Sequence, residues 1–171
     1  RRLFYDGILS KDGNIPCSSC HQQFAAFATF DHNFSHGFNN SFTTRNAPGL
    51  WNLAWHTEFH HDGGINNLEV QPLAPITAPN EMAENITDVV NKLKNDGRYR
   101  QMFRDAFGDD EINSQRMLKA IAQFTGTLIS ANAKYDKVKK GNGNFSVTEQ
   151  RGEAIFLSKC ATCHTPPLFT D

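Results

Sequence analysis

Two copies of one five-residue motif constrain this chain more than any other feature. Residues 17–21 read Cys-Ser-Ser-Cys-His, and residues 160–164 read Cys-Ala-Thr-Cys-His. This pattern is the attachment signature of a c-type haem, in which both thiols bond to the porphyrin edge and the histidine binds the iron. The two copies use all four cysteines of the chain. They predict two covalently bound haem c groups, whose protein ligands are Cys17, Cys20 and His21, and Cys160, Cys163 and His164.

A single zinc ion is the alternative use of these cysteines. Four thiolates from Cys17, Cys20, Cys160 and Cys163 would make a chemically sound zinc site. That site would leave the histidine that directly follows each cysteine pair unexplained. The motif therefore favours haem over zinc.

Length and composition narrow the class of protein further. A chain of 171 residues is enough for one ordinary domain or two small ones. The net charge of −1 gives no basic excess that would indicate nucleic acid as a partner. No apolar run approaches the roughly 20 residues of a transmembrane helix. Because covalent haem is attached outside the cytoplasm in bacteria, we expect a periplasmic protein from which an export signal has been removed.

The pattern of apolar residues predicts an all-α fold. Helical spacing is clear from Glu84 to Asp96, from Tyr99 to Gly108, and from Ile112 to about Ser130. Residues 24–80 lack this spacing and contain several proline and glycine breakers, so a haem is expected to organise them. No stretch alternates convincingly as a strand. The expected architecture is two cytochrome c-like haem domains.

A boundary between the two domains is expected near residue 137. Residues 137–144 form a charged linker rich in glycine and asparagine. Ser146 and Glu149 then have the spacing of a capping box that opens a helix leading into the second motif. We predict a first domain over residues 1–136 and the start of a second over 137–171, which is incomplete because no further helices follow its haem motif.

Five histidines remain after the two motif histidines are assigned: 32, 36, 56, 60 and 61. An iron needs one or two axial ligands, so most of these five must do something else. His36 precedes Gly37 and an asparagine-rich run, which would let its imidazole swing towards or away from iron. His32 is the competing ligand.

The order and spacing of many short segments resemble bacterial di-haem cytochrome c peroxidases over nearly the whole chain. The matching segments are Arg2 to Asp6 with Leu9-Ser10, the first haem motif, Ser35-His36-Gly37, Arg45 to Pro48, Asp62-Gly63, Leu68-Glu69-x-Gln71, Pro75-Ile76, Glu81-Met82, Thr127 to Ser130, Tyr135-Asp136, Arg151-Gly152 and the second haem motif.

This resemblance implies a cytochrome-c peroxidase that reduces hydrogen peroxide to water with electrons from a small cytochrome c or a cupredoxin. The N-terminal haem would be the peroxidatic one, and the C-terminal haem a high-potential electron acceptor. By position, His36 matches the removable distal ligand of the first iron. Gln71 and Glu81 match the polar pair of the distal pocket, and Asn46 matches a calcium ligand between the domains. A homodimer is a further expectation.

Simpler interpretations of these residues stay open at the level of sequence. Gln71 precedes Pro72 and could belong to an ordinary loop. Glu81 could be a carboxylate favoured by a helix N-terminus, and Asn46 could be a turn former.

Two features depart from the resemblance. The family usually has a Trp-Asp-Gly-Arg run between its haems, whereas this chain has His61-Asp62-Gly63-Gly64. This puts the usual inter-haem electron route in doubt. The distal ligand of the second haem would lie after Asp171. The identity of this ligand, Met in the peroxidases and Tyr in a related oxidase that modifies a protein substrate, would separate these two functions.

A plain di-haem electron carrier is a third hypothesis. Gln71 and Glu81 argue against it, because a carrier needs no distal proton shuttle.

Overall fold

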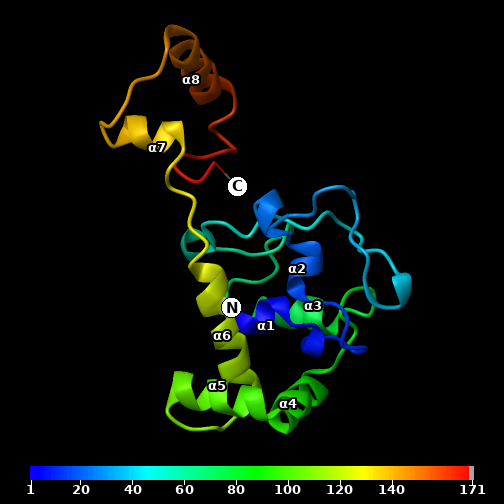
Figure 1. The fold of residues 1–171 in the computed structure, drawn as a ribbon. Coiled ribbons are helices and arrows are strands. Elements are labelled where there is room, and N and C mark those ends of the chain that lie inside the picture. Colours follow the sequence, from blue (N-terminus) through cyan, green and yellow to red (C-terminus); the bar gives the residue numbers. More distant parts are fainter. Residues whose placement is uncertain (170–171) are drawn as a thin grey trace. The chain divides into compact units, whose positions relative to one another are not determined.

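Helices joined by long loops make up residues 1–169, the part of the chain that this computed structural model describes (Figure 1). The α-helices there are α1 (Arg2–Tyr5), α2 (Cys17–Cys20), α3 (Leu73–Thr77), α4 (Ile86–Asn95), α5 (Gly97–Phe107), α6 (Ser114–Gly126), α7 (Lys134–Lys139) and α8 (Val147–Lys159). The short 3-10 helices are η1 (Gly7–Leu9), η2 (Gln23–Ala25), η3 (Phe38–Asn40) and η4 (Leu53–Trp55). Extended pairing within this range is limited to isolated bridges, so the all-α prediction is confirmed.

The chain divides into two compact units, Arg1–Ile129 and a second that starts at Ser130. The predicted linker over 137–144 is helical as far as Lys139, because α7 extends into it. The domain boundary between residues 136 and 137 stays a prediction. Among the described residues, no helix is both long and apolar enough to cross a membrane.

Side-chain caps fix the starts of the three long helices of the first unit. Asn85, Asp96 and Asn113 each accept a hydrogen bond from a backbone N–H in the first turn of α4, α5 and α6. Helix α6 ends at Gly126 rather than near Ser130 as predicted. The carbonyl of Leu128 instead accepts a hydrogen bond of 2.8 Å from the N–H of Asn52, so a tertiary contact draws the chain out of the helix.

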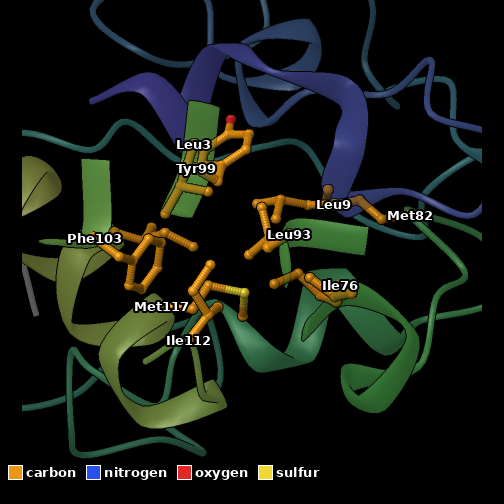
Figure 2. Close-up of a cluster of buried hydrophobic side chains, with 11 residues drawn as sticks. Leu3, Leu9, Ile76, Met82, Leu93, Tyr99, Phe103, Ile112 and Met117 are labelled. Atoms are coloured by element: carbon orange, nitrogen blue, oxygen red, sulfur yellow. The ribbon is translucent and has the colours of Figure 1, made fainter. Parts of the chain in front are cut away.

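The main core joins the N-terminal segment to α4, α5 and α6 (Figure 2). Val89 and Leu93 of α4 and Met117 of α6 have no solvent exposure. Full burial of one such side chain stabilises the fold by about 1.5–3 kcal/mol. The other members of this core are Leu3, Leu9, Ile76, Met82, Tyr99, Phe103, Ile112 and Ile121.

A second apolar cluster anchors the long loop region to α1. Its buried members are Phe4, Leu50, Leu53 and Phe59, and Cys17 of the first haem motif packs against it. The loop over residues 24–80, which lacks helical periodicity, is thus held in part by aromatic and leucine side chains.

In the second unit, α7 and α8 are joined by ion pairs. Lys134 pairs with Glu149 at 2.6 Å, and Lys139 pairs with Glu153 at 2.7 Å. The predicted capping box of Ser146 and Glu149 is confirmed. No residue in the described range 130–169 is buried.

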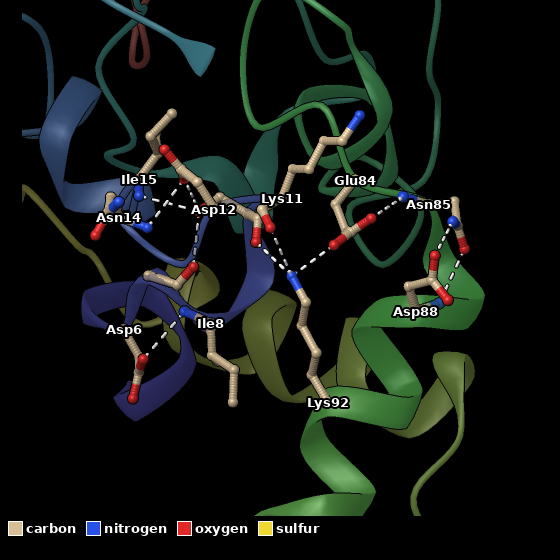
Figure 3. A network of polar contacts seen from close by, with 12 residues as sticks. Asp6, Ile8, Lys11, Asp12, Asn14, Ile15, Glu84, Asn85, Asp88 and Lys92 are labelled. Carbon is tan, nitrogen blue, oxygen red and sulfur yellow. Dashed lines mark hydrogen bonds and ion pairs between the residues drawn. The ribbon is translucent and has the colours of Figure 1, made fainter. Parts of the chain in front are cut away.

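Lys92 of α4 forms an ion pair with Glu84 and hydrogen bonds to the N-terminal segment (Figure 3). The ammonium of Lys92 lies 2.5 Å from a carboxylate oxygen of Glu84, which is 8% exposed. The same ammonium donates to the carbonyl oxygens of Ser10 at 2.6 Å and Lys11 at 3.3 Å. The N–H of Lys11 in turn donates to the carbonyl of Met82 at 3.0 Å. Lys92 thereby joins α4 to the turn just before it and to the N-terminal segment, about 80 residues earlier in the chain.

Lys92→Met is expected to lower the free energy of unfolding by about 3 kcal/mol, because it leaves the Glu84 carboxylate buried without its cation. Urea denaturation would measure the loss. Lys94→Met, on the exposed side of the same helix, is the control and should change stability by less than about 0.5 kcal/mol. Equal losses in the two variants would contradict this role of Lys92.

Candidate haem site

The first haem motif occupies a single helical turn at the wall of an apolar pocket. Helix α2 spans Cys17–Cys20, and the N–H of His21 donates to the carbonyl of Cys17 at 2.9 Å. Burial raises the pKa of the Cys17 thiol to about 12. This environment disfavours a thiolate and suits the neutral thioether that forms when a cysteine bonds to haem.

The hydrogen bonds of His21 leave its ring suited to binding a metal. Nδ1 lies 2.8 Å from the carbonyl oxygen of Phe27 and 3.1 Å from that of Pro48. Both partners are acceptors, so Nδ1 carries the hydrogen and Nε2 keeps its lone pair. Burial lowers the pKa of His21, which favours this neutral form. A ring N–H donated to a backbone carbonyl is the usual support of a metal-binding histidine.

The pocket brings together the residues that the sequence predicts for the first haem and its distal side. Cys17, Cys20 and His21 line it together with His36, Gln71 and Glu81. Its apolar lining includes Phe4, Ile15, Leu50, Ile76, Met82 and Ile121. Paired thiols, a neutral imidazole and an apolar lining fit a covalently held haem.

His36 lies in an exposed loop at this pocket. Its Nδ1 lies 3.0 Å from Oδ1 of Asn40, and its ring centroid is 4.5 Å from that of Phe42. Because Oδ1 can only accept, Nδ1 carries the hydrogen and Nε2 can bind a metal. His32, the competing ligand, pairs with Asp31 at 2.9 Å and does not line this pocket.

The loop that carries His36 is bonded directly to the turn that carries Glu81. The N–H of Phe38 donates to the carbonyl of Glu81 at 2.7 Å, and the amide of Asn80 donates to the carbonyl of Phe42 at 3.1 Å. Gly37 is buried between them, where a Cβ would lie 2.1 Å from the carbonyl oxygen of Asn80. Gly37 is thus required for close packing and has extended backbone, whereas the sequence suggests a hinge there.

Glu81 belongs to a tight turn between α3 and α4. Its N–H donates to the carbonyl of Ala78 at 3.0 Å, and α4 begins only at Ile86, with Asn85 as its cap. The interpretation of Glu81 as a helix N-terminal carboxylate is therefore wrong. Burial raises the pKa of Glu81, while the electrostatic influence of His60, when that ring is protonated, acts in the opposite direction.

Gln71 comes just before α3, and its side chain contacts a histidine. Its amide nitrogen lies 3.5 Å from Nε2 of His60. The sequence alone does not single out His60, because it stands beside His61 in a loop without periodicity. The structure places it next to both polar residues of the pocket.

Asn46 lies outside the pocket and holds the preceding loop. Its side-chain amide donates to the carbonyl oxygens of His32 at 3.3 Å and Asn33 at 3.2 Å. Within the described residues no group of three or more histidine, cysteine or acidic side chains could hold a metal ion. The calcium site expected at Asn46 thus stays a prediction, and no cluster of acidic side chains among the described residues supports it.

The second motif has one backbone hydrogen bond in common with the first. It follows α8, and the N–H of His164 donates to the carbonyl of Cys160 at 2.9 Å, as His21 does to Cys17. Cys160, Cys163 and His164 are all exposed. His61, at the place of the usual inter-haem tryptophan, is also exposed, and its neighbour Asp62 pairs with Arg45 at 2.9 Å.

The first unit consists of short helices around a pocket, and a C-x-x-C-H motif lines that pocket. These features define the c-type cytochrome class of protein. Within that class, a family profile described as di-haem cytochrome c peroxidase matches residues 1–144. Because the match covers most of the sequence, the chain belongs to the di-haem cytochrome c peroxidase family. The family implies haem c as the cofactor.

The similar proteins include both MauG proteins and cytochrome c peroxidases. The methylamine utilization protein MauG of Methylorubrum extorquens is 37% identical over 175 residues, a match that covers 100% of this chain and 49% of that protein. The cytochrome c551 peroxidase of Nitrosomonas europaea is 33% identical over 179 residues, covering 98% of this chain and 50% of that protein. The chain thus spans about half the length of the curated relatives it matches.

Solved structures show the same fold. A MauG-like protein associated with microbial copper homeostasis has a TM-score of 0.86 at 33% identity, with 95% of this chain and 49% of that chain covered. A di-haem peroxidase from Burkholderia thailandensis has a TM-score of 0.76 at 23% identity and supports the fold alone. That match covers 96% of this chain and 47% of that chain.

Proposed function

We propose that this protein reduces hydrogen peroxide to water at a haem held by Cys17, Cys20 and His21. The observation that carries the proposal is that Glu81 and Gln71 line the same pocket as this haem motif. A pure electron carrier needs no carboxylate beside its iron. A peroxidase needs one, because each peroxide consumes two protons and two electrons when it is converted to two waters.

Each residue of the pocket has a distinct role in this proposal. When bound, the haem supplies the iron that exchanges electrons with peroxide. His21 would hold the iron through Nε2, because its Nδ1 hydrogen is donated to backbone carbonyls. Glu81 takes a proton from one peroxide oxygen and returns it to the other, a general acid–base role that its raised pKa favours. The amide of Gln71 orients the peroxide by hydrogen bonding.

His36 controls access to the pocket in this proposal. If His21 and His36 both held the iron, they would exclude peroxide from it, so His36 would have to leave before the reaction. The hydrogen bonds from its loop to Asn80 and Glu81 link that movement to the catalytic turn. Reduction of the second haem would trigger the release.

The second motif would hold the haem that receives electrons from a small cytochrome c or a cupredoxin. We place the protein in the bacterial periplasm, where covalent haem is attached and such donors occur. Calcium at Asn46 and a homodimer remain part of the proposal.

A protein-modifying di-haem oxidase is the second candidate function. It is favoured by the similarity to two MauG proteins, the first 37% identical and the second, from Methylophilus methylotrophus, 34% identical. Both candidates use the same first-haem pocket. They differ in whether the electrons come from a small donor protein or from side chains of a protein substrate.

The two candidates are separated by an assay of the haem-loaded protein with hydrogen peroxide and a reduced small cytochrome c or cupredoxin. The peroxidase proposal expects two donor molecules to be oxidised per peroxide, in many turnovers. Peroxide consumption without donor oxidation would favour the oxidase, and the absence of any reaction with peroxide would contradict both.

A further inference from the structure

His60 lies at a tight turn whose position is fixed from two sides. The N–H of Phe59 donates to the carbonyl of Ile65 at 2.7 Å, which closes the turn, and the Phe59 side chain is buried in the second apolar cluster. The ion pair of Asp62 with Arg45 joins the turn to the segment before Asn46. His60 itself has a left-handed backbone, with φ of 65°. This conformation costs a residue with a side chain about 1–2 kcal/mol, and these contacts hold it in place.

The direction of the contact between His60 and Gln71 follows from hydrogen-bond chemistry. The amide nitrogen of Gln71 can only donate, so the unprotonated Nε2 of His60 must accept across the 3.5 Å between them. One amide hydrogen is then directed at His60. The carbonyl oxygen and the second amide hydrogen of Gln71 remain for the pocket that Gln71 lines.

The ordinary interpretation of an exposed loop histidine is a solvated side chain. Two observations argue against it here. The neutral His60 ring contacts Gln71, and in its protonated form it would lower the pKa of Glu81, so it lies near both polar residues of the pocket. The charged groups of its loop are Glu58, whose carboxylate lies over Gly63, and Asp62, which is paired with Arg45.

We propose that His60 is a positioning residue that holds the Gln71 amide in the orientation required for peroxide. It accepts one amide hydrogen and thereby limits the side chain of Gln71 to the rotamer that faces the pocket. The proposal rests on the proposed peroxidase function for its role in catalysis. The geometry itself can be tested without any turnover.

Crystal structures of the haem-loaded protein test the positioning directly. In the wild type and in His60→Gln, which keeps an acceptor, the Gln71 amide should stay at the pocket. In His60→Ala it should change rotamer or occupy several. An unchanged Gln71 rotamer in His60→Ala would overturn the proposal, whether or not the protein reduces peroxide.

A double-mutant cycle tests the catalytic consequence. His60→Ala alone should lower kcat/KM for peroxide about tenfold, the effect of one lost hydrogen bond. His60→Gln should restore most of it, and His60→Ala should have no further effect in a Gln71→Ala background. His56→Gln, on the same loop, is the control and should retain wild-type kinetics. Additive losses would show that His60 does not act through Gln71, whereas an inactive wild type would refute the peroxidase function and not the positioning.

Discussion

Glu81→Gln is expected to lower peroxide turnover by about 10²-fold or more, the range for a lost general acid–base group. Glutamine has nearly the same shape but cannot accept and return a proton. The backbone bonds that place residue 81, from Phe38 and to Ala78, do not depend on its side chain. The haem absorption spectra should therefore remain those of the wild type, while steady-state kinetics show the loss.

The same substitution should not destabilise the protein. Burial raises the pKa of Glu81 in the folded state above its unfolded value, so the folded chain binds the proton more tightly. The cost of ionising the buried carboxyl is absent below its unfolded pKa and is present in full above its folded pKa. At neutral pH the variant is thus expected to be at least as stable as the wild type.

Glu69→Gln is the matched control for this prediction. Glu69 is an exposed carboxylate two residues before Gln71 and does not line the haem pocket. Its variant should keep wild-type turnover. Unchanged turnover in Glu81→Gln would remove Glu81 from the mechanism, and an equal loss in both variants would indicate a general effect of charge.

His36→Gly is expected to open the first haem in the fully oxidised protein. If His36 binds the oxidised iron, its removal should convert that haem from low-spin to high-spin and allow it to react with peroxide without prior reduction. Electron paramagnetic resonance of the oxidised wild type and the variant would measure the change. His56→Gly is the control, because His56 lies outside the pocket and should leave the spin state unchanged.

An oxidised wild type that is already high-spin would contradict His36 as the resting ligand. The activity towards peroxide after addition of one electron equivalent is then a second test of the gate. A protein gated by His36 gains activity towards peroxide when it is reduced, whereas a permanently open site does not.

The sequence predicts the site better than it predicts the loops around it. The spacing of Cys17, Cys20 and His21 is local, and the helical periodicity from Glu84 onwards gives three helices. The resemblance selects His36, Gln71 and Glu81 from a region without periodicity, and the structure brings all three to one pocket.

Tertiary contacts explain what the sequence does not predict. Gly37 is needed because the Asn80 backbone lies against it, which no local pattern reveals. His60 meets Gln71 only because Phe59 is buried and closes its turn onto Ile65. Helix α6 ends early because Leu128 bonds to Asn52, 76 residues earlier in the chain.

The proposed function depends above all on covalent haem at the two Cys-x-x-Cys-His motifs. The most direct measurement is a pyridine haemochrome assay of the denatured protein after all non-covalent ligands are removed. Two covalent haem motifs should give about two haems per chain, and about one after Cys17→Ser and Cys20→Ser are combined. Release of all haem on denaturation would rule out covalent attachment at both motifs.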